Sequence, residues 1–255
     1  MDIWQETFPL RFGGIDRSDR LTLNATFDFF QEAAISHAEQ LGVGRNAMAS
    51  SGQVWVLSRI SVLFERRPRY GETITVRSWP RGTEKLFALR DYDILDESGK
   101  PAVRGRSGWL ILDMVKRRPL RPQQAVEGFP RNDGLDALPG GGAGLNARDG
   151  LVPAGERRAA YSDIDYNGHV NNTRYVQWIL DVTDPEILEG ADKLRLDINY
   201  LSEVKYGEVT GLWTVPLSGA SDPAFAVSFA AACEGRVKET GQPAFRAELR
   251  TGTGQ

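Results

Sequence analysis

The stretch from residue 161 to 181, YSDIDYNGHVNNTRYVQWILD, alternates an acid, an amide and an imidazole. Asp165, Asn167 and His169 stand at every second position, and His169 is one of two histidines in the chain. In an extended segment, side chains two positions apart point to the same side of the backbone. The three side chains would then share one face, where a carboxylate and an imidazole can move a proton and an amide can hold a substrate or a neighbouring carboxylate.

The residues that follow predict a helix N-terminus beside this series. Asn171 or Asn172 can cap a helix that runs to about Asp181, and Gly168 permits a tight bend before it. A helix N-terminus presents unpaired N–H groups and a partial positive charge. The N–H groups from Val170 to Asn172 could therefore polarise a carbonyl that becomes an oxyanion. A purely structural capped turn explains the same spacing.

The chain contains two copies of one unit. Residues 59–80 align with residues 195–216 at one constant offset, and their Tyr-Gly-Glu triplets coincide. A second pair, GKPAVRGR at 99–106 and GQPAFRAE at 241–248, follows in the same order. Two ordered matches predict a duplication of a unit of roughly 110–125 residues.

Each copy has the same predicted layout of one helix followed by strands with alternating apolar residues. The helices are expected at 24–40 and 172–181. The strands are expected at 54–65, 72–80, 85–96 and 102–114 in the first copy, and at 157–162, 194–202, 208–216, 224–234 and 243–250 in the second. A single helix wrapped by an antiparallel sheet predicts an α+β fold for each copy.

The segment between the copies has a different composition. Residues 119–155 contain five prolines and the run GGG, which interrupt helices and central strands. We therefore predict an N-terminal domain at 1–125, a linker at 126–155 and a C-terminal domain at 156–255.

The composition excludes several classes of protein. The net charge is −3, whereas nucleic-acid-binding domains are usually basic. The sequence has no run of about 18 apolar residues and no secretory signal pattern, and its single cysteine cannot form an internal disulfide. A cytoplasmic protein is therefore expected, without a membrane span. Two histidines and one cysteine predict no metal site and no cofactor.

The two copies differ in the loop before their helix. The first reads FGGIDRSDRLTLNATFDFF and the second reads YSDIDYNGHVNNTRYVQW, so only the second contains a histidine. Duplication followed by the loss of one site would leave this pattern. His37, on the first helix, is expected to be structural. Cys233 lies in the alternating segment AVSFAAACEG and is expected to be a small buried residue.

SDIDYNGHVNNTRYVQWILD, followed by LDINYLSEVKYGE, resembles the second half of the fatty acyl–acyl carrier protein thioesterases of plant plastids and their bacterial relatives. That family has the pattern D-x-N-x-H-V-N-N-x-x-Y before the helix of its second hotdog domain, and a Tyr-x-x-Glu motif at the end of a later strand. The first half resembles the family through QEAAISHAEQLG and VWVLSRISVLFERRPRYGETITVRSW. The resemblance extends from about residue 5 to 250 and implies a tandem hotdog fold.

The resemblance also implies a reaction and the residues that perform it. The reaction is hydrolysis of the thioester of a fatty acyl-acyl carrier protein, a step of fatty acid biosynthesis. Asp165, Asn167, His169 and Glu203 match the family's catalytic positions. Plant members commonly have a cysteine directly after the glutamate, but Val204 stands there in this chain. Water is therefore expected to attack the thioester, activated by His169 with Glu203 or Asp165.

The substrate has two further parts to bind. The first copy lacks the histidine and is the natural place for the acyl chain. The candidate wall residues are Trp55, Leu57, Phe27, Phe30 and Phe87. The acidic acyl carrier protein would dock on a basic rim. The candidates for this rim are Arg66, Arg67, Arg69, Lys116, Arg117 and Arg118.

Three other functions fit parts of the same pattern. They are an acyl-coenzyme A thioesterase, a hotdog lyase that dehydrates 3-hydroxyacyl thioesters, and a non-catalytic acyl-thioester-binding protein. A lyase would release no free thiol, and a binding protein would need none of the four polar site residues. The sequence leaves open the carrier, the acyl chain length, the identity of the general base and whether the chain forms a homodimer.

Overall fold

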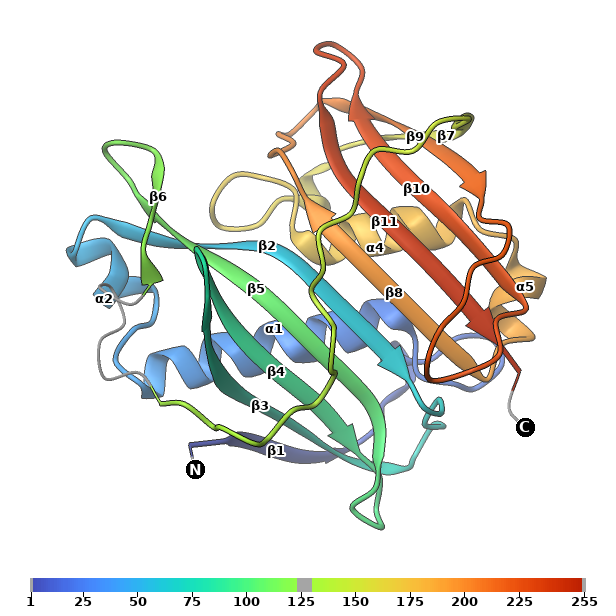
Figure 1. Cartoon of the computed structure of the whole chain (residues 1–255), viewed down its shortest axis with the longest axis horizontal. Coiled ribbons are helices and arrows are strands. Elements are labelled where there is room, and N and C mark those ends of the chain that lie inside the picture. The colour runs from blue at the N-terminus through green and yellow to red at the C-terminus, as the bar shows by residue number, and fades with distance from the viewer. Residues whose placement is uncertain (1, 123–129, 254–255) are drawn as a thin grey trace. The chain divides into compact units, whose positions relative to one another are not determined.

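The computed structural model describes residues 2–122 and 130–253 and divides into two compact units (Figure 1). The N-terminal unit runs up to Val62 and from Arg67 to Gly142, and the C-terminal unit holds Leu63–Arg66 and the residues from Ala143 onward. Among the described residues, no helix is long and apolar enough to cross a lipid bilayer.

The N-terminal unit is a sheet with one long helix. Its helices are η1 (Phe12–Gly14), α1 (Leu23–Gln40) and α2 (Arg45–Ser50). Its strands are β1 (Trp4–Pro9), β2 (Gln53–Phe64), β3 (Thr73–Glu84), β4 (Phe87–Leu95), β5 (Pro101–Asp113) and β6 (Arg118–Leu120). The strand order is β1-β3-β4-β5-β2, and β6 pairs with β5. The pairs β1–β3, β3–β4 and β4–β5 are antiparallel.

Local sequence explains where α1 begins and which face it buries. The hydroxyl of Thr22 accepts a hydrogen bond from the Ala25 amide at 3.1 Å and caps the helix. The buried ring of Phe30 stacks on Tyr92 of β4, with 4.6 Å between the ring centroids. A side chain at Gly105 would begin 2.5 Å from the Phe30 ring, so the close approach of helix and sheet requires glycine there.

A buried polar cluster lies on the same face of the sheet. The buried guanidinium of Arg90 lies 3.1 Å from His37 Nδ1 and donates to Ser78 Oγ at 3.0 Å. Burial, and secondly the positive charge of Arg90, lower the pKa of His37 below its ordinary value of 6.5. The imidazole is therefore neutral near pH 7 and accepts from Arg90 through Nδ1. His37 is a buried core histidine, which agrees with the structural role expected for it.

The C-terminal unit repeats this architecture. Its helices are η2 (Tyr161–Asp163), α4 (Asn172–Asp181) and α5 (Pro185–Glu189). Its strands are β7 (Val152–Arg158), β8 (Lys193–Tyr200), β9 (Val209–Pro216), β10 (Phe229–Val237) and β11 (Pro243–Gly252). The order β7-β9-β10-β11-β8 matches β1-β3-β4-β5-β2 strand for strand, which confirms the predicted duplication and the α+β class. Helix α4 packs on its sheet through Tyr175, whose ring contacts Tyr200 and Phe245.

Two strands begin five residues away from the expected start. The strand expected at 157–162 occupies 152–158, because β7 is an edge strand and tolerates Pro153 at a register shift. The strand expected at 224–234 is found at 229–237, because residues 219–228 form a loop. Strand β1 was not predicted, although its pairing with β3 completes the N-terminal sheet.

The described part of the expected linker is attached to both units. The boundary between the units falls at 142–143, inside the segment 126–155, and residues 123–129 lie outside the described part of the chain. In the N-terminal unit, the Gly142 amide donates to Ser61 Oγ at 2.8 Å. In the C-terminal unit, the Leu145 amide donates to Asn199 Oδ1 at 2.7 Å. Each unit therefore binds its own end of the segment.

Acid should destabilise the protein through His37. The native pKa lies below 6.5, so the unfolded chain takes up the proton first and the free energy of unfolding falls as the pH drops below 6.5. The slope approaches about 1.4 kcal/mol per pH unit for one proton. His37→Asn keeps an acceptor for Arg90 without titrating, and its stability should fall less between pH 7.5 and 5.5, measured by urea unfolding.

His37→Ala serves as the control for this experiment. It leaves a buried Arg90 donor without its acceptor, so we expect a loss of about 1–3 kcal/mol at both pH values. An unchanged pH dependence in His37→Asn would show that another group causes the acid sensitivity.

Candidate active site

The segment that carries the predicted site residues is a tight turn. The Gly168 amide donates to the Asp165 carbonyl at 3.0 Å, and the Asp165 amide donates to the His169 carbonyl at 2.9 Å. Gly168 has φ +82°, a conformation that glycine adopts without strain. The extended geometry expected for residues 165–169 is therefore wrong. We call residues 165–168 the site turn.

Side-chain bonds to the backbone explain why the turn forms here. Asp165 Oδ1 accepts from the Asn167 amide at 2.8 Å, and the Asn167 side-chain amide lies 3.5 Å from Asp165 Oδ2. This is the local bonding by which aspartate favours turns over strands. The side chains of Asp165 and Asn167 are thus close together. The turn brings them together, and they do not share the face of a strand.

Three contacts hold the loop after β8 against the residues that follow the site turn. The Val170 amide donates to the Val204 carbonyl at 2.8 Å, and His169 forms an antiparallel bridge with Lys205. The Tyr200 hydroxyl donates to the Asn172 carbonyl at 3.1 Å and so ties the end of β8 to the start of α4. These contacts place Glu203 beside His169, 34 positions away in the sequence.

His169 and Glu203 form a direct pair. His169 Nε2 lies 3.1 Å from Glu203 Oε2, and their side chains are 28% and 53% exposed. A pair this accessible contributes little to stability, but water and a substrate can reach it. The arrangement is an imidazole oriented by a carboxylate, which is the basic unit of general-base catalysis.

The N-terminus of α4 offers fewer free N–H groups than the sequence predicts. Asn171 caps the helix by accepting from the Thr173 amide at 3.0 Å. The Val170 amide is bound to Val204, and the Asn171 amide donates to the Asp163 carbonyl at 2.8 Å. Of the three amides expected to polarise a substrate, only that of Asn172 remains a candidate within the described residues.

Tyr175 lies behind the pair and was predicted only as part of the apolar face of its helix. Burial raises the pKa of its hydroxyl well above the ordinary value, and the nearby backbone of Val204 offsets part of this increase. The charge of Glu203 acts on it as well. The available signal was its position in the pattern D-x-N-x-H-V-N-N-x-x-Y, which singles out this tyrosine.

The N-terminal unit contains a turn with the same backbone bonds, which we call the matched turn (residues 16–19). The Asp19 amide donates to the Asp16 carbonyl at 3.0 Å, the Asp16 amide to the Arg20 carbonyl at 2.9 Å, and Asp16 Oδ1 accepts from the Ser18 amide at 2.9 Å. Asp19 has φ +62° at the position of Gly168. The two turns are copies of one backbone structure.

The side chains at the predicted catalytic positions differ between the two copies. Arg20 stands where the second copy has His169, and Arg67 stands where it has Glu203. Arg67 is buried, and its Nη2 lies 2.5 Å from Asp16 Oδ2. Asp16 is thus retained in a turn that has no imidazole, where its carboxylate holds the turn and pairs with arginine. The same turn bond in the second copy indicates that Asp165 has at least a structural role.

The structure does not bring the five candidate wall residues together. Phe27 and Phe30 are buried on α1, and Phe30 faces Tyr92. Phe87 and Tyr92 lie five positions apart on β4, so they point to opposite faces of the sheet. Phe87 instead packs under Arg59, 3.8 Å from the ring centroid to the guanidinium carbon. The other two candidates lie on β2: Trp55 packs against Met48 and Ile111, and Leu57 is buried.

The candidate basic rim is not one surface. Arg67 is buried in its pair with Asp16, so its assignment to the rim is wrong. Arg66 belongs to the C-terminal unit. Lys116, Arg117 and Arg118 lie at the β5–β6 hairpin, where the Met114 amide donates to the Gly52 carbonyl just before β2.

Arg69 follows the other end of β2, and that strand has 12 residues. A strand of this length separates its ends by more than about 30 Å. Arg69 and the hairpin cations therefore cannot contact the same small patch of a carrier protein.

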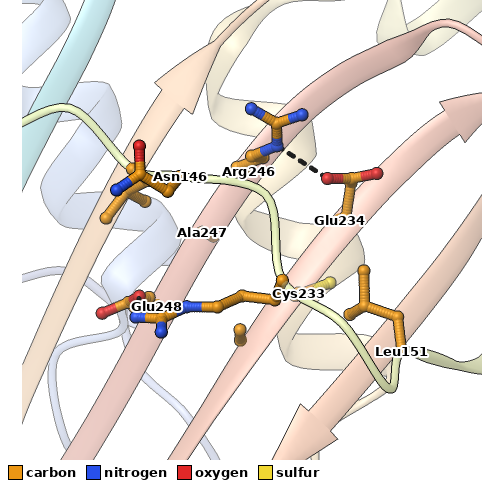
Figure 2. A pocket seen from close by; sticks show the side chains of 10 residues that line it. Asn146, Leu151, Cys233, Glu234, Arg246, Ala247 and Glu248 are labelled. Carbon is orange, nitrogen blue, oxygen red and sulfur yellow. Dashed lines mark hydrogen bonds and ion pairs between the residues drawn. The ribbon is translucent and has the colours of Figure 1, made fainter.

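Cys233 has no role in the site. It is buried on β10, and burial raises the pKa of its thiol to about 12. Figure 2 shows the pocket next to it, where Arg246 Nε lies 2.7 Å from Glu234 Oε2 and Arg148 Nη2 lies 2.5 Å from Glu248 Oε1. These charges neutralise one another, and none of the predicted site residues lines the pocket. Within the described residues, no group of acidic, histidine or cysteine side chains could hold a metal ion.

Sequence profiles of one protein family match both halves of the chain. The sequence profile of the acyl-ACP thioesterase N-terminal domain matches residues 1–126, and that of the C-terminal domain matches residues 155–246. An acyl-[acyl-carrier-protein] hydrolase of Cuphea viscosissima is 24% identical over 218 residues, which cover 79% of this chain and 52% of that protein. A dodecanoyl-[acyl-carrier-protein] hydrolase of Cinnamomum camphora is 25% identical over 233 residues, covering 86% and 61%. The chain thus spans about half the length of the curated relatives it matches.

Solved structures share the fold over nearly the whole chain. An acyl-ACP thioesterase from Bacteroides thetaiotaomicron superposes with a TM-score of 0.81 at 24% identity, covering 98% of both chains. The 12:0-ACP thioesterase from Umbellularia californica gives a TM-score of 0.76 at 22% identity, covering 97% of this chain and 93% of that one. The fold and the site define a tandem hotdog protein. The matches to both domain profiles show that the chain belongs to the acyl-ACP thioesterase family.

The burial of Cys233 predicts its reactivity. A thiol with a pKa of about 12 has almost no thiolate at neutral pH, so the native protein should react with a thiol-trapping dye far more slowly than the urea-unfolded protein. Cys233→Ala should keep the wild-type rate of any thioester hydrolysis. Loss of that activity in a folded Cys233→Ala variant would contradict a water-based mechanism.

Proposed function

We propose that the protein hydrolyses the thioester of a fatty acyl-acyl carrier protein, releasing a free fatty acid and the thiol of the carrier. The observation that carries the proposal is the 3.1 Å contact between His169 Nε2 and Glu203 Oε2 in the unit that matches the family's C-terminal domain. The position after Glu203 is Val204, which has no nucleophilic group.

In this mechanism Glu203 orients His169. When Nε2–H of the neutral imidazole donates a hydrogen bond to the carboxylate, Nδ1 keeps its lone pair and serves as the general base. It removes a proton from water as the water oxygen attacks the thioester carbonyl carbon. A tetrahedral oxyanion forms and then collapses, breaking the carbon–sulfur bond. The imidazolium returns its proton to the departing sulfur, which leaves as the thiol.

The oxyanion needs donors placed at the start of α4. We assign this role to the side-chain amide of Asn167 and the backbone amide of Asn172. The amides of Val170 and Asn171 already donate to backbone carbonyls and are not assigned. Asp165 holds the site turn. The base is therefore assigned to the His169–Glu203 pair rather than to Asp165.

The acyl chain is assigned to the N-terminal unit, on the face of the sheet that α1 covers. Phe27 and Phe30 supply apolar surface there. This unit has no imidazole at the matched turn, so no chemistry competes with binding. Acyl-coenzyme A is the alternative substrate within the same reaction class.

Substitution of the pair should abolish most of the activity. His169→Ala and Glu203→Gln are each expected to lower turnover by at least about a hundredfold, the usual scale for the loss of a general base or its partner. The assay measures thiol release from acyl carrier protein and coenzyme A thioesters over a series of chain lengths. The same assay identifies the preferred carrier and separates hydrolysis from dehydration, which releases no thiol.

The chain contains a matched control for His169. His37→Asn changes the other histidine, which is buried against Arg90 and far from water, and should leave the rate at pH 7.5 within about twofold of wild type. Full activity in folded His169→Ala would refute the assignment.

Two substitutions at Asp165 separate its structural role from proton transfer. Asp165→Ala removes the turn bond and should lower turnover by about a hundredfold. Asp165→Asn keeps an oxygen that can accept from the Asn167 amide, so it should retain much more activity than Asp165→Ala. If both variants lose activity equally while remaining folded, Asp165 itself acts as the base or as another charged catalytic group.

A further inference from the structure

Three tyrosines next to the site turn expose their side chains. Tyr161, Tyr166 and Tyr206 are 88%, 62% and 69% exposed. We propose that these three residues, which we call the tyrosine collar, bind the pantetheine arm that carries the thioester. The inference rests on the proposed function, because it assigns a binding role to the surroundings of the same pair.

The backbone places all three tyrosines beside the His169–Glu203 pair. Tyr166 is the second residue of the site turn, between Asp165 and Asn167. Tyr206 directly follows Lys205, the bridge partner of His169. Tyr161 lies in this region because the segment that precedes it is hydrogen-bonded to the loop after β8. The Gly207 amide donates to the Ala159 carbonyl and the Ala159 amide to the Glu208 carbonyl, both at 2.9 Å.

The chemistry of tyrosine suits the arm. Pantetheine is uncharged and carries two amides and a gem-dimethyl group. A tyrosine ring offers apolar surface for the methyl groups, and its hydroxyl can exchange hydrogen bonds with the amides. Its side chain also has few rotatable bonds, so ordering it on a ligand costs little conformational entropy. Three such rings on two adjacent loops give a contact surface that is largely exposed to solvent.

The charges around the collar argue against the acidic carrier protein as its occupant. Residues 158–169 and 203–208, which carry the collar and the pair, contain four carboxylates and two side chains that are always cationic near pH 7. The carboxylates are Asp163, Asp165, Glu203 and Glu208, and the cations are Arg158 and Lys205. An acidic protein face would be repelled by this excess of negative charge. An uncharged arm avoids that repulsion, so the collar fits the arm and not the body of the carrier.

The N-terminal unit shows which part of the collar is specific to the site. Phe12 and Tyr70 stand at the positions of Tyr161 and Tyr206, and are 78% and 56% exposed. Their rings contact each other edge to face, with centroids 6.4 Å apart. The position of Tyr166 is occupied by Arg17. Tyr166 is therefore the collar residue found only in the turn that carries the histidine, and it is the sharpest test.

The experiment compares two thioesters of the same fatty acid. One is the acyl-pantetheine thioester, and the other is the S-ethyl thioester, which lacks the arm. The variants are Tyr166→Ser and the triple variant Tyr161→Ser, Tyr166→Ser, Tyr206→Ser. The matched control is Phe12→Ser with Tyr70→Ser, which removes equally exposed rings from the unit that lacks the histidine. Folding of each variant is checked by circular dichroism.

We expect the triple variant to lose about tenfold or more in kcat/KM for the pantetheine thioester, mainly through KM, and Tyr166→Ser to lose a large share of this. The S-ethyl thioester should change by less than about twofold in both variants, and the control should change neither substrate. Equal losses for the two thioesters, no loss for either, or the same loss in the control would overturn the proposal.

A binding measurement keeps this inference separate from the proposed reaction. S-methylpantetheine has the arm but no thioester, and its binding can be followed by isothermal titration calorimetry. The collar predicts binding to the wild-type protein that weakens in the triple variant, whether or not the protein hydrolyses any thioester. Failure of the wild-type protein to bind S-methylpantetheine would overturn the collar. Thioester hydrolysis that persists in that case would leave the proposed function intact.

Discussion

The hydrogen bond from the Val170 amide to the Val204 carbonyl is the interaction on which the site depends. It joins the turn before α4 to the loop after β8, and the pair of His169 and Glu203 exists only because these two loops meet. The N-terminal unit keeps the same bond between Leu21 and Pro68, at 2.8 Å. The sheet and helix of each unit therefore converge on one loop junction. In each unit, the backbone of that junction places the two residues at the matched positions side by side, regardless of their side-chain type.

The two junctions show that the fold does not determine the chemistry. In one of them an imidazole faces a carboxylate at a position open to solvent. In the other, a buried arginine neutralises an aspartate. The backbone bonds of the turns are the same, so the difference lies entirely in the side chains. The retained aspartate is explained by its bonds to the turn, which a catalytic role alone would not predict.

The sequence predicts much of the fold and part of the site, and the reasons for its failures are physical. The duplication predicts that the two units share one architecture, which their matching strand orders confirm. The α4 boundaries at 172 and 181 were correct, because Asn171 is a strong cap. The start of β7 was missed because Pro153 was read as a strand breaker, although an edge strand tolerates it. The site turn was read as extended because alternation alone does not reveal bonds from side chain to backbone. Arg67 was counted as a surface cation because its partner is 51 residues away in the sequence.

The presence of both junctions in one chain has a consequence for how such a protein can evolve. In a homodimer of identical single units, every mutation appears twice, so a change that improves one junction for binding also alters the other. Fusion of the two copies removes this symmetry. The junction with Arg20 and Arg67 could then lose its imidazole and acid while the junction with His169 and Glu203 kept them. In the described part of the chain there is consequently one exposed histidine–glutamate pair, so the proposed centre occurs once per polypeptide rather than once per hotdog unit.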